Sequence, residues 1–524
     1  MFSNSSQGIE EFRESNKIKE TIFNVLNSIE RMGKKMTIQV KESNFTDYKT
    51  LQFKILTIEQ IKQIVNNALR ILENTGSIVH SEEARTLLKN AGCTIDGVKV
   101  KIPSKLIEKA LSTAPSKIVL SDQNGNEKLF LEGNNSYFGP GPTCPNFRDP
   151  QTGERRETLT QDVANTAIVA DALPNIDFVM SLSMISDCTA TLADVYEVRA
   201  MLENSTKPIV GWTFDVDGLK EIVDMCSAVA GGLEKLQKNP FLVIYCEPTS
   251  PLTHTKEAVE KLLYLAERKL PVVYPPGIVL GGTGPMTIAG GLSQGLAETL
   301  VGLLLSQLKN EGAPFIAAIQ GGPLDMKTMQ HSYGAPELTL LIAASADIFH
   351  YLNLPIWSFA GATDSKVVDQ QAAIEATLQI FAAAASGAHL IHDVGFTDLG
   401  LTGSLEQLVM GDEIIGMVRR LIKGIDVDEE HLAYDVINEV GPGGSYLGQE
   451  HTFKHFRTET WKPTLLDRQS YAGWEADGEK SMNDRMSDKV KLILKEHKPE
   501  PLPEEVIKEL DAIIASAEQR VLNK

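Results

Sequence analysis

Eight short apolar runs divide the middle of the chain, and each is followed by a stretch in which apolar residues recur at helical spacing. The runs occupy residues 136–139, 178–181, 208–212, 241–245, 271–274, 315–319, 355–359 and 389–392. The helical stretches after them begin near Thr160, Thr189, Asp217, Thr255, Thr287, Ala335, Lys366 and Ser404. Continuous apolar strands that alternate with helices predict a parallel sheet covered on both faces. Eight such units predict an α/β fold of the closed (β/α)8 TIM barrel type.

The alternative to a barrel is a doubly wound open sheet. We favour the barrel because no GxGxxG turn follows the first run and because the units are evenly spaced. Residues 131–425 are therefore predicted to form a catalytic barrel, preceded by an N-terminal helical α+β segment at 56–130. The alternation then stops, which predicts a C-terminal helical appendage at 426–524. Residues 1–35 lack a periodic apolar face, so we expect an extension that can be deleted, with Met36 as an alternative start.

The net charge of −19 over 524 residues argues against nucleic acid and anionic membranes as partners, because both require a basic footprint. It leaves room for a cationic substrate. The five cysteines include no CxxC pair, which fits a reducing compartment without disulfides. No apolar run is long enough to span a membrane without polar interruption, and the N-terminus has no signal-peptide pattern. We therefore expect a cytoplasmic protein.

Chemistry in a barrel of this type is expected at the carboxyl ends of the strands and in the loops that follow them. Aromatic residues collect there, and such rings at a pocket mouth suit a quaternary ammonium through cation–π attraction. The candidate substrate-binding residues are Tyr137, Phe214, Glu247, Tyr274, Gln320, His350, Phe359 and His392. Glycines in the same loops would let a large flat ligand approach the backbone closely. They are Gly281, Gly282, Gly284, Gly321, Gly322 and Gly361.

Several segments resemble the trimethylamine methyltransferase family. They are residues 282–290, 333–337, 354–366, 369–375 and 392–395, and the likeness extends from about 56 to 451. Family members that act on trimethylamine carry pyrrolysine in the barrel, whereas this chain contains only standard residues. It is therefore similar to the non-pyrrolysine branch, whose characterised members act on glycine betaine and related quaternary amines.

The resemblance implies a methyltransferase that demethylates a quaternary amine and transfers the methyl group to the Co(I) of a corrinoid protein. Glycine betaine, proline betaine and carnitine are the substrates to consider. The cofactor, cob(I)alamin or methylcorrinoid, would be carried by that partner, with none bound tightly to this chain. A quaternary ammonium releases a neutral tertiary amine and needs neither protonation nor a Lewis acid, so we expect no metal site. The six candidate glycines would line the corrinoid approach.

The polar candidates have separate expected roles. Glu247 is expected beside the ammonium, His392 beside a substrate carboxylate, and Gln320 beside that carboxylate or the corrinoid. His350 is expected either in a cofactor-facing loop or as a satisfied buried histidine. Asp364 is expected to cap the helix that begins near Lys366.

Two other functional classes remain open. One is a non-catalytic barrel that binds betaine. The other is a lyase or aldolase that uses Lys366 or Lys327 as a Schiff base, which is disfavoured because none of the eight runs contains a lysine. The sequence leaves the identity of the amine open, and we expect a homo-oligomer.

Overall fold

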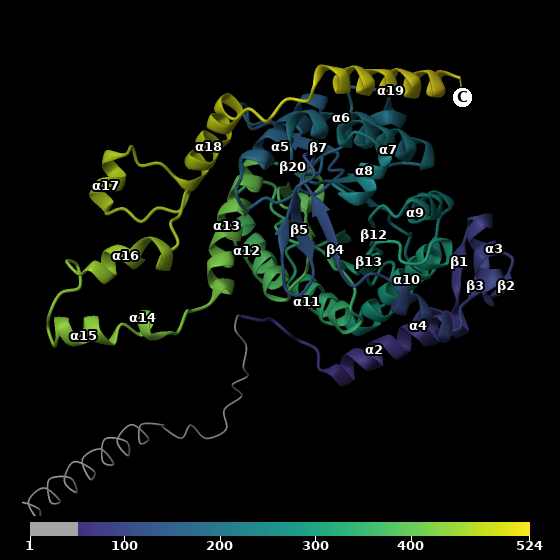
Figure 1. Cartoon of the computed structure of the whole chain (residues 1–524), viewed down its shortest axis with the longest axis horizontal. Helices are drawn as coiled ribbons and strands as arrows, with labels where there is room; N and C mark the ends of the chain where they lie inside the picture. Colours follow the sequence, from purple (N-terminus) through teal and green to yellow (C-terminus); the bar gives the residue numbers. More distant parts are fainter. Residues whose placement is uncertain (1–50, 524) are drawn as a thin grey trace, which may run out of the picture. The chain divides into compact units, whose positions relative to one another are not determined.

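Short parallel strands lie at the centre of the structure, with helices around them (Figure 1). The structure is a computed structural model that describes residues 51–523. The central strands are β6 (Tyr137–Phe138), β9 (Ile209–Trp212), β10 (Leu242–Tyr245), β12 (Val272–Tyr274), β14 (Phe315–Ala317), β17 (Trp357–Phe359) and β18 (Leu390–His392). They confirm all but one of the predicted strands. The extension at 1–35, which we expect to be dispensable, lies outside the described residues.

Hydrogen bonds join these strands in the order of the sequence. One parallel sheet has the order β14-β12-β10-β9 and another β17-β18-β6. Run 178–181 is not a strand, contrary to the prediction, because only Val179 pairs there, through a parallel bridge to Ile209 of β9. Ala317 of β14 forms a similar bridge with Ile356, and the Asp177 backbone N–H donates to the Phe138 carbonyl of β6 at 2.6 Å. Segments adjacent in sequence are therefore adjacent in space, as expected for consecutive β/α units.

Helices follow the strand segments at the expected places. They are α5 (Thr160–Ala172), α6 (Ala193–Asn204), α7 (Val216–Ala230), α8 (Leu233–Lys238), α9 (Lys256–Arg268), α10 (Ile288–Lys309), α11 (Pro336–Tyr351), α12 (Gln370–Ala385) and α13 (Leu405–Lys423). Thr255 and Ser404 cap α9 and α13 through their side chains, as their residue types predict. The predicted start near Lys366 is wrong by about one helical turn. Asp369 instead caps α12 by accepting the Ala372 backbone N–H.

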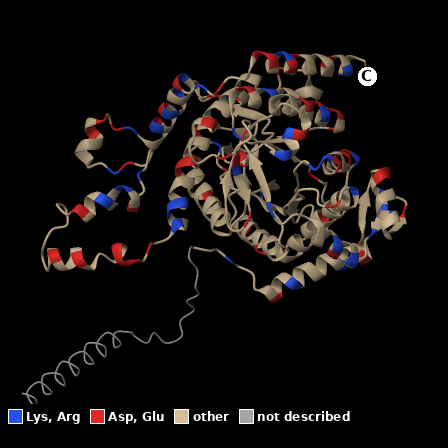
Figure 2. Cartoon of the chain, viewed as in Figure 1, with Lys and Arg blue, Asp and Glu red and all other residues tan. Residues whose placement is uncertain are grey.

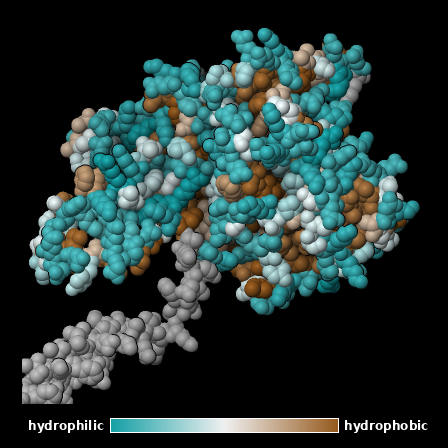
Figure 3. Space-filling model, viewed as in Figure 1, coloured by the Kyte–Doolittle hydropathy of each residue, from teal (hydrophilic) through white to brown (hydrophobic). Residues whose placement is uncertain are grey.

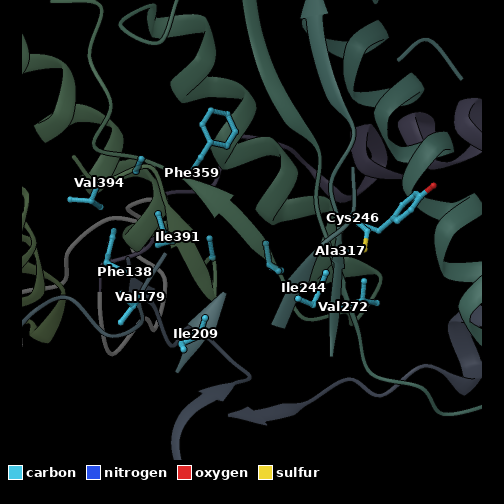
Figure 4. Close-up of a cluster of buried hydrophobic side chains, with 14 of the residues drawn as sticks. Phe138, Val179, Ile209, Ile244, Cys246, Val272, Ala317, Phe359, Ile391 and Val394 are labelled. Atoms are coloured by element: carbon cyan, nitrogen blue, oxygen red, sulfur yellow. The ribbon is translucent and has the colours of Figure 1, made fainter. Parts of the chain in front are cut away.

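Alternate residues along the strands enter two hydrophobic clusters, because successive side chains point to opposite faces. The inner cluster takes one residue from each of several strands, namely Val210, Val243, Val273, Ile316, Trp357 and Leu390. The larger outer cluster is shared with the helices and contains Ile209, Ile244, Val272, Ala317 and Ile391 among others (Figure 4). Both faces of the strands are buried, which explains their continuous apolar sequences.

The hairpin of β4 (Ile118–Ser121) and β5 (Glu127–Leu131) closes the amino ends of the strands. Its Leu120 and Leu131 belong to the inner cluster. The Ser121 backbone N–H donates to the carbonyl of Pro240, two residues before β10. The amino side of the inner cluster is therefore covered with apolar side chains.

The N-terminal part of the described chain is a small α+β layer. It comprises α2 (Ile58–Arg70), a π-helical turn (Ile71–Thr75), α3 (Glu82–Ala91), α4 (Ser104–Thr113), and a sheet of order β11-β1-β3-β2. Its strands are β1 (Ser77–Val79), β2 (Thr94–Asp96), β3 (Lys99–Lys101) and β11 (Thr253–His254). Val100 is buried between exposed Lys99 and Lys101, as their alternation in the sequence predicts.

Helix α10 is long and apolar enough to cross a membrane by length and composition alone. However, 83% of its most apolar 18-residue window is buried inside the protein. The ring of Tyr274 lies so close to Gly302 of α10 that an added Cβ would approach it to 2.3 Å. These contacts are those of a core helix in a globular protein.

Two accessory sheets follow the carboxyl ends of the central strands. One consists of β13 (Gly277–Leu280), β15 (Gln320–Asp325) and β16 (Gln330–His331). The other has the order β19-β20-β7-β8, from β7 (Asn146–Arg148), β8 (Arg155–Glu157), β19 (Phe396–Thr397) and β20 (Thr402–Gly403). Both place loop residues over the strand ends, where the chemistry of an α/β protein is expected.

The C-terminal region is helical, with α14 (Glu429–Leu432), α15 (Tyr434–Val440), α16 (Glu450–Glu459), α17 (Tyr471–Ala476), α18 (Met482–Glu496) and α19 (Glu504–Leu522). Helix α18 packs on α13 and α5, and α19 packs on α7 and α6. Arg520 of α19 binds Glu221 of α7 through two hydrogen bonds of 2.8 Å. Acidic and basic residues are interspersed along these outer helices (Figure 2).

Candidate substrate-binding site

A cavity of about 300 Å³ lies at the carboxyl ends of the central strands. Its lining comes from the ends of β10, β17 and β18 and from both accessory sheets. The lining residues are Pro142, Thr143, Tyr245, Glu247, Gly277, Ile278, Val279, Gln320, Gly321, His331, Tyr333, Phe359, His392, Asp393 and Phe396. The cavity therefore occupies the position where α/β folds hold their ligands.

Glu247 follows β10 and provides a carboxylate in this cavity. An added Cβ at Gly277 would lie 2.4 Å from Glu247 Oε1, so glycine is required there for the glutamate to pack. Glu247 is exposed by surface area, because its side chain meets solvent through the cavity, although protein surrounds the carboxylate elsewhere. Burial, reinforced by the nearby charge of Asp393 and opposed by a hydrogen bond from Tyr245, raises the pKa of Glu247 to about 7.

A row of polar groups extends from Glu247 across the cavity floor. The Tyr245 hydroxyl is 3.2 Å from Glu247 Oε2 and 2.8 Å from Gln320 Oε1. Gln320 Nε2 is 2.5 Å from His392 Nε2, and His392 Nδ1 is 2.7 Å from Asp393 Oδ1. Gln320, His392 and Asp393 are all buried. Hydrogen bonds orient Glu247, Tyr245, Gln320 and His392 in turn, whereas His392 Nδ1 and Asp393 Oδ1 lie close together without a hydrogen bond of good geometry.

Aromatic rings form the apolar side of the cavity. Phe359 and Phe396 are buried, and Tyr333 contacts Phe396 edge-on at a centroid distance of 6.4 Å. Trp357 lies behind His392, with stacked rings 4.6 Å apart. Aromatic faces beside a carboxylate are the usual environment for a bound organic cation.

The loop that carries Tyr333 is held by side chains from α12 and from the loop before it. The Tyr333 backbone N–H donates to Asp364 Oδ1 at 2.7 Å, and Gln379 Nε2 donates to the Tyr333 carbonyl at 2.8 Å. Glu375 accepts the Asp364 backbone N–H at 2.8 Å. The prediction that Asp364 caps the next helix is therefore wrong, because its carboxylate is used to position Tyr333.

The electrostatic character of the cavity is acidic. It contains the carboxyl groups of Glu247 and Asp393, and no lysine or arginine is among its described lining residues. Burial lowers the pKa of His331 despite the opposing charges of Asp364 and Asp393, so this histidine is neutral at pH 7. The site therefore favours a cation over an anion.

Two lining residues have positive φ angles although they are not glycine. Thr143 has a φ of 61° and Asp393 a φ of 76°. This backbone conformation is costly for residues with a Cβ and persists only where the surroundings impose it. The strain in Asp393 fixes its carboxylate beside His392.

Of the predicted substrate-binding residues, Glu247, Gln320, Phe359 and His392 line the cavity together, and the other four lie elsewhere. Tyr137 packs against the inner cluster near the hairpin, and its hydroxyl accepts the Phe130 backbone N–H at 3.1 Å. Phe214 is 43% exposed and contacts Trp212 edge-on.

Tyr274 and His350 are likewise outside the cavity. Tyr274 points to the helix side of β12, where its hydroxyl is 2.8 Å from His254 Nδ1. His350 ends α11, and its Nε2 is 3.1 Å from the Ser386 carbonyl, so it is the satisfied histidine of the two alternatives. Because both faces of these strands are apolar, the sequence does not show which alternate residues face the cavity and which face the helices.

Among the predicted glycines, only Gly321 lines the cavity. Gly281, Gly282 and Gly284 form the turn after β13, in which the Gly282 and Gly284 N–H groups bond the Val279 carbonyl. An added Cβ at Gly322 would lie 2.8 Å from His331 Nε2, and Gly361 has a φ of 89° against Val394. Most of these glycines therefore serve tight turns and close packing.

Sequence reasoning missed several lining residues. His331 ends β16 and Tyr333 follows it. The sequence of the β15–β16 hairpin has no alternation of apolar and polar residues that would predict it. Tyr245 was visible as an aromatic strand end, and Tyr333 and Asp393 belong to the segments 333–337 and 392–395 that carry the family resemblance. Those segments were the available signal.

Nearly the whole of the described chain matches one known family. A model described as trimethylamine methyltransferase matches residues 29–521. The chain belongs to this family. The match confirms the resemblance seen in the sequence.

Relatives in the trimethylamine methyltransferase family cover most of the chain. The trimethylamine methyltransferase MttB of Desulfitobacterium hafniense (strain DSM 10664 / DCB-2) is 34% identical over 462 residues, which are 88% of this chain and 93% of that protein. The glycine betaine methyltransferase of Desulfitobacterium hafniense (strain Y51) is 31% identical over 90% of this chain and 98% of that protein. The solved Methanosarcina barkeri monomethylamine methyltransferase MtmB is 13% identical, with a TM-score of 0.44 over 90% of this chain and 96% of that one.

Four of the five segments that carry the trimethylamine methyltransferase resemblance line or support the cavity, and segment 282–290 contributes no lining residue. Segment 392–395 supplies His392 and Asp393, and segment 333–337 supplies Tyr333. Segments 354–366 and 369–375 supply Asp364 and Glu375, which brace Tyr333. These motifs therefore build and support this cavity.

Proposed function

We propose that this chain is a methyltransferase that demethylates a quaternary amine and delivers the methyl group to the Co(I) of a corrinoid protein. The observation that carries the proposal is the cavity that combines Glu247 with aromatic rings and lacks a lining lysine or arginine. A relative named for glycine betaine adds support for a quaternary amine, while one named for trimethylamine makes the tertiary amine the main competitor.

We also propose that the eight strand segments close into a (β/α)8 barrel. Support comes from the sequence-ordered contacts between neighbouring segments, including those of Val179 and Ile356. A further support is the inner cluster, in which alternate residues of the strands meet. In such a barrel the cavity would lie at the carboxyl end, where barrel enzymes hold their substrates.

Binding would use the acidic and aromatic sides of the cavity together. Glu247 would attract the ammonium, and Tyr333, Phe359 and Phe396 would present ring faces to its methyl groups. A betaine carboxylate would depend on neutral donors such as the Gln320 amide, since no cationic side chain lines the described cavity. Glycine betaine, proline betaine and carnitine all remain substrates to test.

Methyl transfer from a quaternary amine requires the protein mainly to position the substrate. The corrinoid supplies the nucleophile to which the methyl carbon bonds, while the carbon–nitrogen bond breaks and its electron pair stays on nitrogen. The leaving group is then a neutral tertiary amine that needs no proton. Because positive charge leaves the amine, a glutamate with a pKa of about 7 binds the cation without overstabilising the ground state. Orientation by the fixed row from Tyr245 to His392 would supply the remaining catalysis.

The state of the cysteines bears on where in the cell the protein works. All five cysteines are free, which supports a reducing compartment and our proposal of a cytoplasmic protein.

Lys366 donates to the Asp364 carbonyl and Lys327 lies in the β15–β16 turn. Neither lines the cavity, so a Schiff-base lyase has no support there.

The proposed function is tested by methyl transfer to free cob(I)alamin, followed by its absorption spectrum over a panel of amines. We expect turnover with a quaternary amine and none with trimethylamine or methanol, because only the quaternary amine already releases a neutral amine without any proton transfer. Binding of a betaine without methyl transfer would favour the non-catalytic alternative. Equal rates with trimethylamine would contradict our choice of substrate class.

A bulky residue at Gly282 should obstruct the methyl acceptor. Gly282 lies in an exposed turn beside the cavity wall formed by Val279, and its φ is not positive. For Gly282→Trp we expect turnover with the corrinoid protein to fall about tenfold, with little change in amine affinity measured by calorimetry. Gly448→Trp, at an open position in the C-terminal region, serves as the control. Loss of amine binding would show that the turn shapes the substrate pocket instead.

A further inference from the structure

The C-terminal arm, defined here as residues 426–480, lacks a hydrophobic core. Helices α14, α15, α16 and α17 contain no buried residue, and Leu465 is the buried apolar residue of the arm. Leu447 and Phe453 are 91% and 73% exposed. The arm appears in Figure 3 as largely hydrophilic surface with separate hydrophobic patches. Apolar burial therefore contributes little to its stability.

Polar contacts join the arm to α13, and a few exposed ion pairs, such as that of Glu430 with Lys454, connect α14 to α16. Glu413 of α13 accepts backbone N–H groups from Thr464, Leu465 and Leu466. Arg420 donates to the Glu459 carbonyl at 2.9 Å. A hollow of about 1250 Å³ lies between α16 and the segment that follows it, lined by residues from Phe456 to Arg485. Exposed ion pairs contribute about 1 kcal/mol or less each, so these contacts hold α14 only weakly against α16.

A cluster of metal-binding side chains connects those two helices. His451, His455 and Glu459 recur every fourth residue of α16, so they lie on one helical face. His431 approaches them from α14. Ligand atoms of His431, His455 and Glu459 all lie within 4.8 Å of one another, which suits a single ion with bonds of about 2.0–2.2 Å.

The histidines are oriented as metal ligands usually are. His431 Nδ1 is 2.7 Å from Asp428 Oδ1, which leaves Nε2 directed to the cluster, 3.9 Å from Glu459 Oε1. A carboxylate on the second ring nitrogen is the common support of a metal-bound histidine. Arg420 is 3.6 Å from Glu459 Oε2, so the Oε1 atom remains available.

Two imidazole nitrogens in the cluster are buried without a hydrogen bond of good geometry, and that of His451 has no ion-pair partner among the described residues either. The Nε2 atoms of His451 and His455 make no hydrogen bond of acceptable geometry within the described residues. Their rings are 4.4 Å apart. Glu430 Oε1 lies 3.1 Å from His455 Nε2, but Glu430 also pairs with Lys454. Buried, unpartnered nitrogens are unfavourable unless a ligand satisfies them.

We propose that His431, His455 and Glu459 bind one divalent transition-metal ion, with zinc the first candidate, and that this ion ties α14 to α16. Two imidazoles and one carboxylate favour zinc over calcium or magnesium, which prefer oxygen ligands. His451 lies one turn before His455 on the same face of α16, with the two rings 4.4 Å apart. The role is structural, because an ion of this kind replaces the core that the arm lacks.

This site differs from the sequence expectation of no metal. That expectation overlooked His451 and His455, whose four-residue spacing on a helix is suited to zinc. None of the cluster residues lines the cavity described above. The metal is therefore independent of methyl transfer and is not expected in that reaction.

Zinc binding by the full chain, purified without a histidine tag and stripped with chelator, tests the proposal. Calorimetry with zinc chloride should show one equivalent bound. His431→Ala and His455→Ala should each weaken zinc binding about a hundredfold. His80→Ala, which removes an exposed histidine outside the arm, should leave it unchanged. Glu459→Gln keeps the side-chain size and should weaken binding about tenfold. This variant tests the site even if an alanine variant fails to fold.

Limited proteolysis supplies a second readout. Zinc should slow cleavage within residues 426–480 about fivefold in the unmodified chain and leave the rate unchanged in His455→Ala. Circular dichroism checks that each variant remains folded. The proposal would be overturned by the absence of stoichiometric zinc binding, or by His431 and His455 variants that bind zinc as tightly as the unmodified chain. It would also be overturned if zinc left the cleavage rate of the unmodified chain unchanged.

Discussion

Replacing Glu247 with Gln is expected to lower kcat/KM for the quaternary amine about a hundredfold. The amide keeps the size of the side chain and removes the charge that faces the cation in a cavity without a lining lysine or arginine. A quaternary ammonium has no N–H to donate, so the interaction lost is a charge–charge attraction, worth up to about 4 kcal/mol at 4 Å in a partly solvated site. Methyl transfer measured over a range of amine concentrations checks the expectation. Glu257→Gln, in the exposed first turn of α9, is the matched control.

The pH dependence identifies Glu247 further. Its pKa of about 7 means that the carboxylate that attracts the cation forms as pH rises through 7. Amine affinity should therefore increase about tenfold from pH 6 to pH 8 in the unmodified protein and stay level in Glu247→Gln. A pH-independent affinity in the unmodified protein would contradict the assignment of Glu247.

The raised pKa of Glu247 also predicts that the free energy of unfolding depends on pH. The folded pKa of Glu247 lies above the ordinary value of 4.5, so the folded state holds its proton more tightly than the unfolded state does. The free energy of unfolding should then decline as pH rises from about 4.5 to 7, and Glu247→Gln should lack this part of the decline. If Glu247→Gln loses activity and has a higher free energy of unfolding at pH 8, then Glu247 serves function and lowers the stability of the fold.

Gly321→Ala is expected to lower the free energy of unfolding by about 4 kcal/mol or more. Gly321 has a φ of 140°, and an added Cβ would lie 1.9 Å from the Ile278 carbonyl oxygen of the neighbouring strand. Backbone strain and backbone overlap would therefore act together, and neither can be relieved by rotating a side chain. Denaturant unfolding measures the loss.

Gly282→Ala provides the comparison for this variant. Its φ is not positive, and the nearest atom to an added Cβ is Val279 Cγ1 at 3.2 Å, so it should cost less than about 1 kcal/mol. Similar stabilities for the two variants would show that β13 and β15 adapt more readily than their pairing indicates. The sequence suggested both glycines as probes of the methyl acceptor's approach, but the structure leaves only Gly282 suitable.

The order of the strands and helices was largely predictable because each depends on local signals. Apolar runs mark strands such as β10 and β14, and residues such as Thr255 and Ser404 cap the helices where their side chains predict. Residues 178–181 are apolar for a different reason, since Phe178 and Met180 enter the inner cluster without forming a ladder. Burial alone did not distinguish them from a strand.

The candidate site was predictable only in part. Glu247, Gln320 and His392 sit at strand ends, which a barrel places together. Tyr274 occupies a similar place but faces α10, and the phase of alternation cannot be read where both faces are apolar. His331 and Tyr333 depend on the pairing of β13 with β15, a non-local contact with no signature in composition.

The β4–β5 hairpin has a kinetic consequence. Because its leucines cover the amino side of the inner cluster, the cavity communicates with solvent at its other end. Under the proposed function, that end would serve amine, product and methyl acceptor alike. A docked acceptor would then trap whatever lies beneath it. Substrate binding is accordingly expected to be ordered, with the amine entering first and the demethylated product leaving only after the acceptor has withdrawn.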